Sequence, residues 1–350
     1  MHKGVIYALL AAALFGASTP FAKALIGQAA PVMLAGLLYL GSGLGLLIWY
    51  TLRALAARGQ QPTTARLTRQ DLPWLGGAIL TGGIAGPVLL MFGLTLTPAS
   101  SASLLLNMEG VLTALLAWFV FKENFDRRIF LGMVLIVAAG VLLSWQQRPA
   151  LGVPWGALAI VAACLCWAID NNLTRKVSAS DAVQIAGIKG LVAGSVNLSI
   201  ALALGSPWPE ASTALIAGVV GFGGYGLSLV LFVLALRHLG TARTGAYFSV
   251  APFAGAAIAL VMLGETPDPV FWVAAALMGA GIWLHLTETH AHAHTHVLMS
   301  HAHGHSHDAH HQHSHDFPWD GKEPHSHPHQ HEPLTHSHPH FPDIHHRHRH

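Results

Sequence analysis

The sequence predicts an all-α integral membrane protein with ten transmembrane helices and a disordered C-terminal tail. Hydrophobic types make up 53% of the 350 residues and charged types only 10%, whereas about 25% of the residues in a typical soluble domain are charged. Ten mostly apolar stretches follow one another along the chain, and the 61 residues after them, 290–350, hold 23 of the 26 histidines. A water-soluble globule is excluded because so few charges cannot cover its surface.

Each apolar stretch is expected to be helical. A bilayer core takes about 20 apolar residues per helix, and lipid gives the backbone no hydrogen-bond partner outside the segment itself. Connections marked by Gly, Pro and Ser separate several of the stretches. In chain order, the predicted spans are 4–26, 31–51, 72–93, 99–121, 128–146, 154–173, 183–204, 212–236, 241–263 and 269–286.

The distribution of Lys and Arg predicts the orientation. With the N-terminus in the cytoplasm, twelve of these residues fall on the cytoplasmic side and only two, Lys23 and Arg148, on the opposite side. Positive charge is retained on the cytoplasmic side, so we expect this orientation. An even number of spans then returns the C-terminus to the cytoplasm. We therefore expect a multi-pass protein in the lipid bilayer of the cytoplasmic (inner) cell membrane.

The chain contains an internal duplication. Residues 95–123 and 237–265 are both 29 residues long, and both end in a glutamate. Small residues match in phase, as Ala99 does with Thr241. The duplication therefore relates the fourth predicted span to the ninth.

The opening spans of the two halves match more loosely, with Phe15-Gly16…Lys23 opposite Trp167-Ala168…Arg175. Each half then has five spans, and an odd number means that the second half inserts upside down relative to the first. Inverted repeats recur in secondary transporters, which bind their solute between the halves near the middle of the membrane. The pattern thus favours transport by alternating access.

The repeated segment resembles the EamA-type repeat of the drug/metabolite transporter (DMT) superfamily. The residues that carry the resemblance are Ala99…Glu123 in the first copy and Thr241…Pro252…Gly264-Glu265 in the second. One position departs from the family pattern, because Gly110 stands where the family usually has a proline. The histidine-rich tail lies outside the pattern.

The resemblance implies a fold, an organisation and an activity. It implies ten helices in two inverted EamA repeats and solute transport across a bacterial-type cytoplasmic membrane, often as export. The expected parts are a first repeat over 1–147, a second over 154–286 and a disordered cytoplasmic tail over 287–350.

Glu109 is the leading candidate for a functional group inside the membrane. It lies near the middle of the fourth predicted span, and an ionisable group at that depth usually faces a cavity or a partner. We interpret Glu109 as a carboxylate that couples a proton or cation, or that contacts the cargo. The alternative is permanent pairing with a buried cation such as Lys189, which only locks helices together. Asn107 is a second pathway candidate, although it lies about 200° around the helix from Glu109.

Further candidates lie in the second half. Asp170 and Asn171 are placed toward the cytoplasmic end of the sixth span and Lys189 inside the seventh. Asp170 and Asn171 either reach the pathway or form a polar helix end. Lys189 either extends its ammonium to the membrane surface or pairs with Asp170 or Glu109. Tyr225, in a glycine-rich stretch, either lines the pathway or packs where glycines let helices touch.

The tail alternates His with small or polar residues. Its prolines and few aliphatic residues leave it without a core, so we expect disorder. Neutral imidazole is a good ligand for Zn, Ni, Co and Cu, so we expect the tail to bind such an ion. The alternative is a soluble appendage that gains charge as the cytoplasm acidifies. The candidate ligands are His290, His292, His294, His296, His301, His303, His305, His307, His313 and His315.

The predicted function is secondary-active transport, in the export direction, of a small molecule or ion, with a link to transition metals through the tail. The alternative is a membrane-anchored metal buffer or sensor that transports nothing. The spans lack a P-loop and a paired catalytic set, so we expect an ion gradient as the energy source and no enzyme activity. No cofactor is expected beyond the tail's metal ion. The charge pattern favours no nucleic acid. The sequence leaves open whether the protein forms a homodimer.

Overall fold

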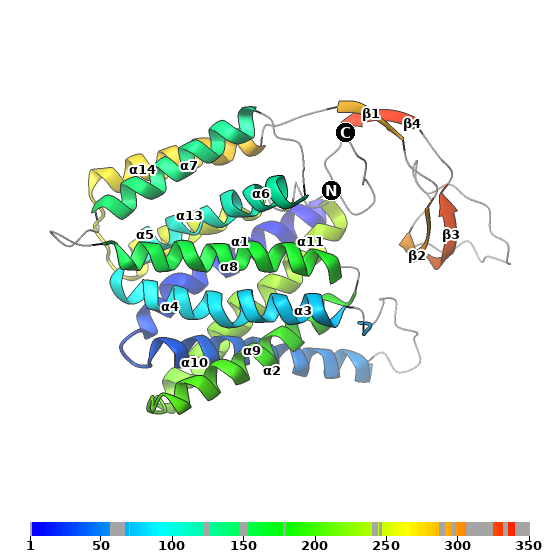
Figure 1. Cartoon of the computed structure of the whole chain (residues 1–350). Coiled ribbons are helices and arrows are strands. Elements are labelled where there is room, and N and C mark those ends of the chain that lie inside the picture. Colours follow the sequence, from blue (N-terminus) through cyan, green and yellow to red (C-terminus); the bar gives the residue numbers. More distant parts are fainter. Residues whose placement is uncertain are drawn as a thin grey trace.

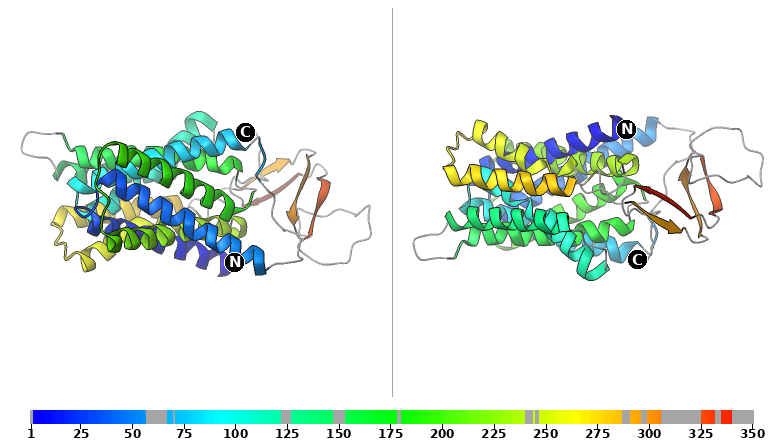
Figure 2. Two further views of the ribbon diagram at one scale, coloured as in Figure 1. Left: turned by 90° about the horizontal axis from the view of Figure 1, so that it is seen from below. Right: turned by 90° about the horizontal axis from the view of Figure 1, so that it is seen from above.

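The computed structural model describes residues 2–56, 67–69, 71–121, 127–146, 153–177, 180–239, 244, 247–286, 291–295, 299–305, 325–331 and 335–339. The helices form a bundle in which most of them lie roughly side by side (Figure 1). The views from below and above show that the strands of the tail lie beyond one end of this bundle (Figure 2).

The helical elements follow the predicted spans closely. The first half contains α1 (His2–Leu25), α2 (Pro31–Ala56), α3 (Leu72–Ala78), the π-helical segment η1 (Ile79–Ala85), α4 (Gly86–Leu96), α5 (Ala99–Leu105), α6 (Met108–Phe121) and α7 (Arg127–Gln146). The second half contains α8 (Trp155–Val177), α9 (Ala182–Ala203), α10 (Ala211–Gly221), the π-helical segment η2 (Phe222–Leu227), α11 (Ser228–Leu239), α13 (Ala251–Met262) and α14 (Pro269–Leu286).

Six of the described helices are long and apolar enough to cross a membrane. They cover Lys3–Leu25, Pro31–Arg53, Leu72–Leu96, Trp155–Thr174, Ala182–Ala203 and Ala211–Ala235. The shorter apolar helices are Phe130–Trp145, Ala251–Met262 and Pro269–Leu284. Large apolar side chains also cover the outside, such as Val261 at 87% exposure and Trp283 at 61%. An apolar outer surface of this extent is typical of a membrane protein, and it agrees with the predicted helical bundle in lipid.

The two halves of the chain pack on each other rather than standing apart. α2 lies along α9, α7 along α14 and α4 along α8, while α1 contacts α11 and α13 (Figure 1). Glycines allow the closest of these approaches, because a Cβ on Gly43 or on Gly190 would collide with the facing helix in the α2–α9 pair. The two halves therefore contact each other closely along α2 and α9.

Two of the predicted spans contain a π-helical turn. η1 interrupts the span expected over 72–93, and η2 interrupts the span expected over 212–236. A π turn holds extra backbone in one turn of the helix and often marks a functional position. Each segment contains a Gly-Gly pair, Gly82-Gly83 in η1 and Gly223-Gly224 in η2.

Two other spans are broken. A turn at residues 106–107 separates α5 from α6 inside the range expected as one helix over 99–121. In the range expected over 241–263, a turn at residues 249–250 directly precedes α13. Both ranges are therefore interrupted, a few residues before Gly110 in the first and before Pro252 in the second.

Parts of the tail are described as four short strands. It contains β1 (Ala291–Thr295), β2 (Met299–His305), β3 (His325–His331) and β4 (Thr335–Pro339). β1 pairs with β4 and β2 with β3, both antiparallel. The alternation of His with another residue has a period of two, which is the period of a strand, and the register places histidines opposite histidines in both pairs.

Candidate functional site

A carbonyl group of η1 is the meeting point of several buried side chains. Pro87 has no N–H group, so it cannot donate to the carbonyl four or five residues earlier. The oxygen of Gly82 instead accepts hydrogen bonds from the Tyr39 hydroxyl at 2.7 Å and from Nε1 of Trp167 at 3.0 Å. The proline therefore opens the backbone of η1 to α2 and α8.

Asp170 and Lys189 form a buried ion pair beside this carbonyl. The Lys189 ammonium donates to Oδ2 of Asp170 and so joins α9 to α8, while the hydroxyl of Thr174 donates to Oδ1 at 2.9 Å. The two charged residues are only 4% and 6% exposed. Gly82 packs so closely on Asp170 that a Cβ at the glycine would overlap the carboxylate. The charges thus come from the second half, and the first half covers them.

Asn197 extends this polar region along α9. Its Nδ2 donates to the oxygen of Gly83 at 3.2 Å. The whole residue is buried, and among the described residues its Oδ1 has no hydrogen-bond partner. A buried acceptor of this kind is available to a donor from a bound molecule.

Glu109 is bonded to α8 rather than to a cation. Nδ2 of Asn171 donates to its Oε1 at 2.7 Å, which joins α6 to α8. In the described part of the chain, Lys189 pairs with Asp170. The interpretation of Glu109 as a permanent partner of Lys189 is therefore wrong. Glu109 is half-buried and Asn171 exposed, so this acid is open on one side.

Tyr225 belongs to a group of aromatic rings next to the ion pair. Its ring centroid lies 5.2 Å from that of Tyr39 and 6.0 Å from that of Phe15. Phe15 also lies 6.1 Å from Trp167 and 5.5 Å from Phe248. Both halves contribute rings, which form an apolar wall beside the buried charges.

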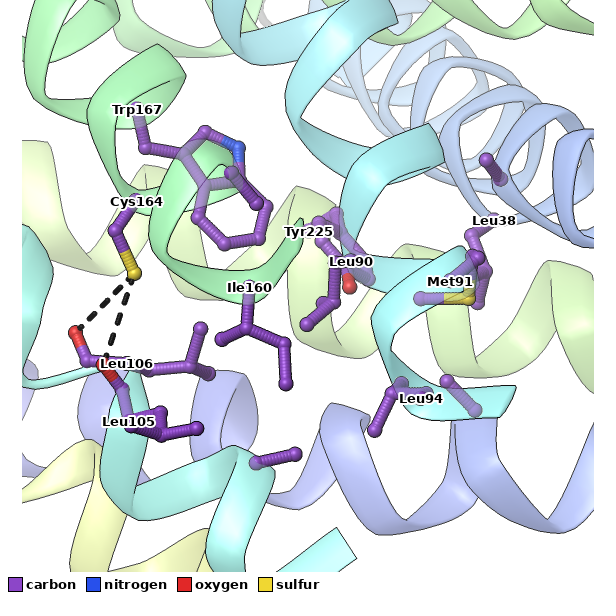
Figure 3. Packing of buried hydrophobic residues seen from close by; sticks show 14 of the residues in the cluster. Leu38, Leu90, Met91, Leu94, Leu105, Leu106, Ile160, Cys164, Trp167 and Tyr225 are labelled. Carbon is purple, nitrogen blue, oxygen red and sulfur yellow. Dashed lines mark hydrogen bonds between the residues drawn. The ribbon is translucent and has the colours of Figure 1, made fainter. Parts of the chain in front are cut away.

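Asn107 lies apart from this region. It occupies the break between α5 and α6, where its Nδ2 donates to the oxygen of Leu104 at 2.9 Å and lies 3.5 Å from the sulfur of Met278. The sulfur of the Cys164 thiol lies 3.8 Å from the carbonyl oxygen of Leu105 and 3.9 Å from that of Leu106 (Figure 3). These side chains satisfy backbone groups that the break leaves free.

A second polar cluster lies where α4 ends and α5 begins. Both carboxylate oxygens of Glu265 accept hydrogen bonds, from the backbone N–H groups of Ala99 at 2.8 Å and Ser100 at 2.9 Å. The Lys23 ammonium donates to two carbonyl oxygens at the end of α4. The Glu265 carboxylate thus faces the N-terminal end of α5, and the Lys23 ammonium faces the C-terminal end of α4, each being the helix end of opposite partial charge. Lys23 and Glu265 come from different halves of the chain.

The described residues contain no group of three or more His, Cys, Asp or Glu side chains arranged for a metal ion. Of the predicted tail ligands, His292, His294, His301, His303 and His305 fall in β1 and β2. The others, His290, His296, His307, His313 and His315, lie outside the described residues.

Sequence reasoning missed Tyr39, Trp167 and Gly82 as members of the polar region. The signal that could have found them is the Gly82-Gly83 pair followed by Pro87 in the middle of a span. A proline there must leave a carbonyl unpaired, and neighbouring helices in lipid have to supply the donors. Asp170 and Lys189, which were candidates, lie together, and so do Glu109 and Asn171.

Comparison with known proteins matches both halves of the chain to one family. The model of the EamA-like transporter family matches residues 2–145 and again residues 154–287. An "Uncharacterized transporter" of Methanothermobacter thermautotrophicus is 29% identical over 298 residues, which cover 80% of this chain and 85% of the relative. A "Probable terminal-alkyne amino-acid exporter" of Streptantibioticus cattleyicolor is 27% identical over 234 residues, 66% of this chain and 78% of that protein.

The fold is also similar to that of a solved structure. A chain described only as "Crystal structure of protein" superposes with a TM-score of 0.59 at 19% sequence identity, covering 79% of this chain and 94% of the other. At this identity the likeness concerns the fold alone.

Proposed function

Because this chain belongs to the EamA-like transporter family of the DMT superfamily, we propose that it exports a small organic solute from the cytoplasm by alternating access. The energy comes from an ion gradient. The observation that carries the proposal is the buried Asp170–Lys189 pair at the contact between the two halves. Buried ionisable groups in membrane segments mark solute or ion pathways.

Ten crossings in two inverted halves, over 1–147 and 154–286, are part of this proposal. The sequence register that aligns Ala99 with Thr241 also aligns Gly82 with Gly224, and both of these glycines lie in a π-helical turn. The helix breaks before α6 and before α13 fall at nearly the same aligned position. Interrupted helices in corresponding positions of two halves are typical of secondary transporters.

The orientation and location are proposed from the charge distribution. The excess of Lys and Arg places both chain ends in the cytoplasm and the protein in the cytoplasmic membrane. The ion pair then lies nearer the cytoplasmic end of α8, and the Lys23–Glu265 cluster lies at the outer end of the bundle.

We assign the coupling role to Glu109. Its carboxylate is half-buried and held by one amide donor, so a proton or cation can reach it without breaking an ion pair. The Asp170–Lys189 pair, the amide of Asn197 and the aromatic rings form the region that contacts the cargo. Amino acids are the first cargo class to test, because one relative is described as an amino-acid exporter.

Transport in liposomes tests this function. Purified full-length protein should release a mixture of labelled amino acids from preloaded vesicles when an ion gradient is imposed, and Glu109→Gln should remove the dependence on the gradient. Flux through Glu109→Gln equal to that of the native protein would exclude Glu109 from coupling. Release no faster than from vesicles without the protein, for every solute tested, would reject the transport function.

The tail carries a second proposal. Five cross-strand positions pair histidine with histidine, two between β1 and β4 and three between β2 and β3. Imidazole is a good ligand for Zn, Ni, Co and Cu, so these paired histidine positions support metal binding by the tail. The tail then either collects metal for export or senses it. A metal buffer that transports nothing is the competing function.

A further inference from the structure

The two π-helical segments provide an internal comparison for the charged pair. Gly82 of η1 packs on Asp170 of α8, and Gly224 of η2 packs on Ser18 of α1. The alignment of the opening spans of the two halves places Ser18 opposite Asp170. The same packing arrangement therefore occurs twice, once with a carboxylate and once with a hydroxyl.

Lys189 also has a counterpart in the first half. α2 and α9 contact each other reciprocally, as two related halves must. The contacts are Gly43 with the backbone of Leu191 and Gly194 with the backbone of Leu40. This reciprocity aligns Leu40 with Leu191, and therefore aligns Leu38 with Lys189. Leu38 is fully buried.

The counterpart arrangement packs without any ion pair. Ser18 is 2% exposed and donates to the Phe15 oxygen of its own helix at 2.6 Å. Removing a carboxylate and an ammonium from water is costly, and their mutual attraction often fails to compensate. Because a serine and a leucine are sufficient in the related position, helix packing alone does not explain the charges of Asp170 and Lys189.

We propose that Lys189 is a tethered cation that pairs with Asp170 when the carrier is empty and is displaced from Asp170 by an ammonium group of the cargo. This inference rests on the proposed transport function and names its cargo class, a small solute with an ammonium and an anionic group. When the cargo ammonium binds Asp170, the Lys189 ammonium turns to the anionic group. The site is electrically neutral both empty and loaded.

Neutrality in both states determines how the carrier returns. A lone carboxylate at this depth has to remain at one surface or bind another cation before the halves can change conformation. With Lys189 in place, the empty carrier reorients by itself, so the protein performs net export and needs no exchange for an external solute. The pair thus decides between net transport and obligatory exchange.

The test compares two kinds of efflux from liposomes that contain the full chain and a mixture of labelled L-amino acids. Net efflux is measured into plain buffer, and exchange efflux into buffer with the same unlabelled amino acids. For Lys189→Met, the ratio of exchange to net efflux should rise at least about tenfold, because the empty site now holds an uncompensated carboxylate. Lys189→Arg, which keeps the charge, should raise the ratio much less than Lys189→Met does.

A double substitution controls for folding. Asp170→Ser with Lys189→Leu copies the residues of the counterpart arrangement, so it should fold even if Lys189→Met alone does not. Net and exchange efflux of amino acids should both fall at least about tenfold, because the cargo ammonium has lost its partner. Native efflux in this double variant would show a purely structural pair and overturn the proposal, as would an unchanged ratio in Lys189→Met.

The cargo panel separates this inference from the general function. Amino acids should be carried better than their analogues without the amino group. A native carrier that moves only solutes without an ammonium group would overturn the inference and leave transport intact. Failure to move any solute would instead remove the transport function on which the inference rests.

Discussion

Asn171 donates a hydrogen bond from Nδ2 to Oε1 of Glu109 at 2.7 Å. The bond connects α8, which carries Asp170, to α6, which begins directly after a break in its span. The carboxylate assigned to coupling is therefore linked through one residue to the helix that carries the cargo-binding acid. A change of charge on Glu109 can reach Asp170 through this helix.

Asn171→Ala should weaken coupling. Loss of the amide donor removes a hydrogen bond worth about 0.5–1.5 kcal/mol, which corresponds to a decrease in gradient-driven flux of about two- to tenfold. Asn172→Ala is the matched control, because Nδ2 of Asn172 donates to Ala168 within its own helix at 2.8 Å. Equal flux in the two variants would mean that the bond to Glu109 has no role in coupling.

Gly82→Ala should destabilise the protein. The new Cβ would overlap the Asp170 carboxylate, and overpacking of this kind costs about 1–3 kcal/mol in the free energy of unfolding. In Gly223→Ala the Cβ meets open space, so a change below about 0.5 kcal/mol is expected. Unfolding of both variants in detergent, followed by circular dichroism, measures the difference. Similar losses would argue against close packing of η1 on Asp170.

Tyr39→Phe should remove one of the two donors to the Gly82 oxygen. Trp167 still bonds this oxygen, so the expected loss is about 0.5–1.5 kcal/mol of unfolding free energy. Tyr247→Phe serves as the control, because Tyr247 is 36% exposed. If the two substitutions were equally mild, the hydroxyl of Tyr39 would contribute nothing measurable.

Glu265→Gln should weaken the connection between α4 and α5. Glu265 caps the backbone of Ala99 and Ser100 from a distant part of the chain. Gln keeps one acceptor oxygen for these two N–H groups, and a lost capping bond costs about 0.5–2 kcal/mol. Glu210→Gln is a suitable comparison, since Glu210 precedes α10 but its side chain makes no capping hydrogen bond. Equal thermal stability of the two variants would contradict a capping role.

Deletion of residues 290–350 should separate transport from metal binding. The truncated protein is expected to keep its flux, because the proposed site lies in the helices, and to lose the binding of Ni²⁺ and Zn²⁺ measured by isothermal titration calorimetry with the full chain. Loss of flux together with metal binding would favour the metal buffer. Unchanged metal binding would remove the tail from any metal role.

Much of the helical arrangement could be predicted from hydropathy, but its interruptions could not. Hydropathy located the ranges of the helices to within a few residues, because lipid requires long apolar segments with internally satisfied backbones. The π turns and the helix breaks depend on donors from other helices, such as the Tyr39 hydroxyl at Gly82. Hydropathy along one segment contains no information about these donors.

The sequence by itself determined that this protein is a helical membrane protein of the EamA-like transporter family, because apolar length and repeated small residues are properties of a single chain segment. It also named Asp170, Lys189, Glu109 and Asn171 as candidates. Only the tertiary structure decided that Lys189 pairs with Asp170 and that Asn171 holds Glu109. Such pairings depend on contacts between helices distant in the chain, and these contacts exist only after the two halves have packed together.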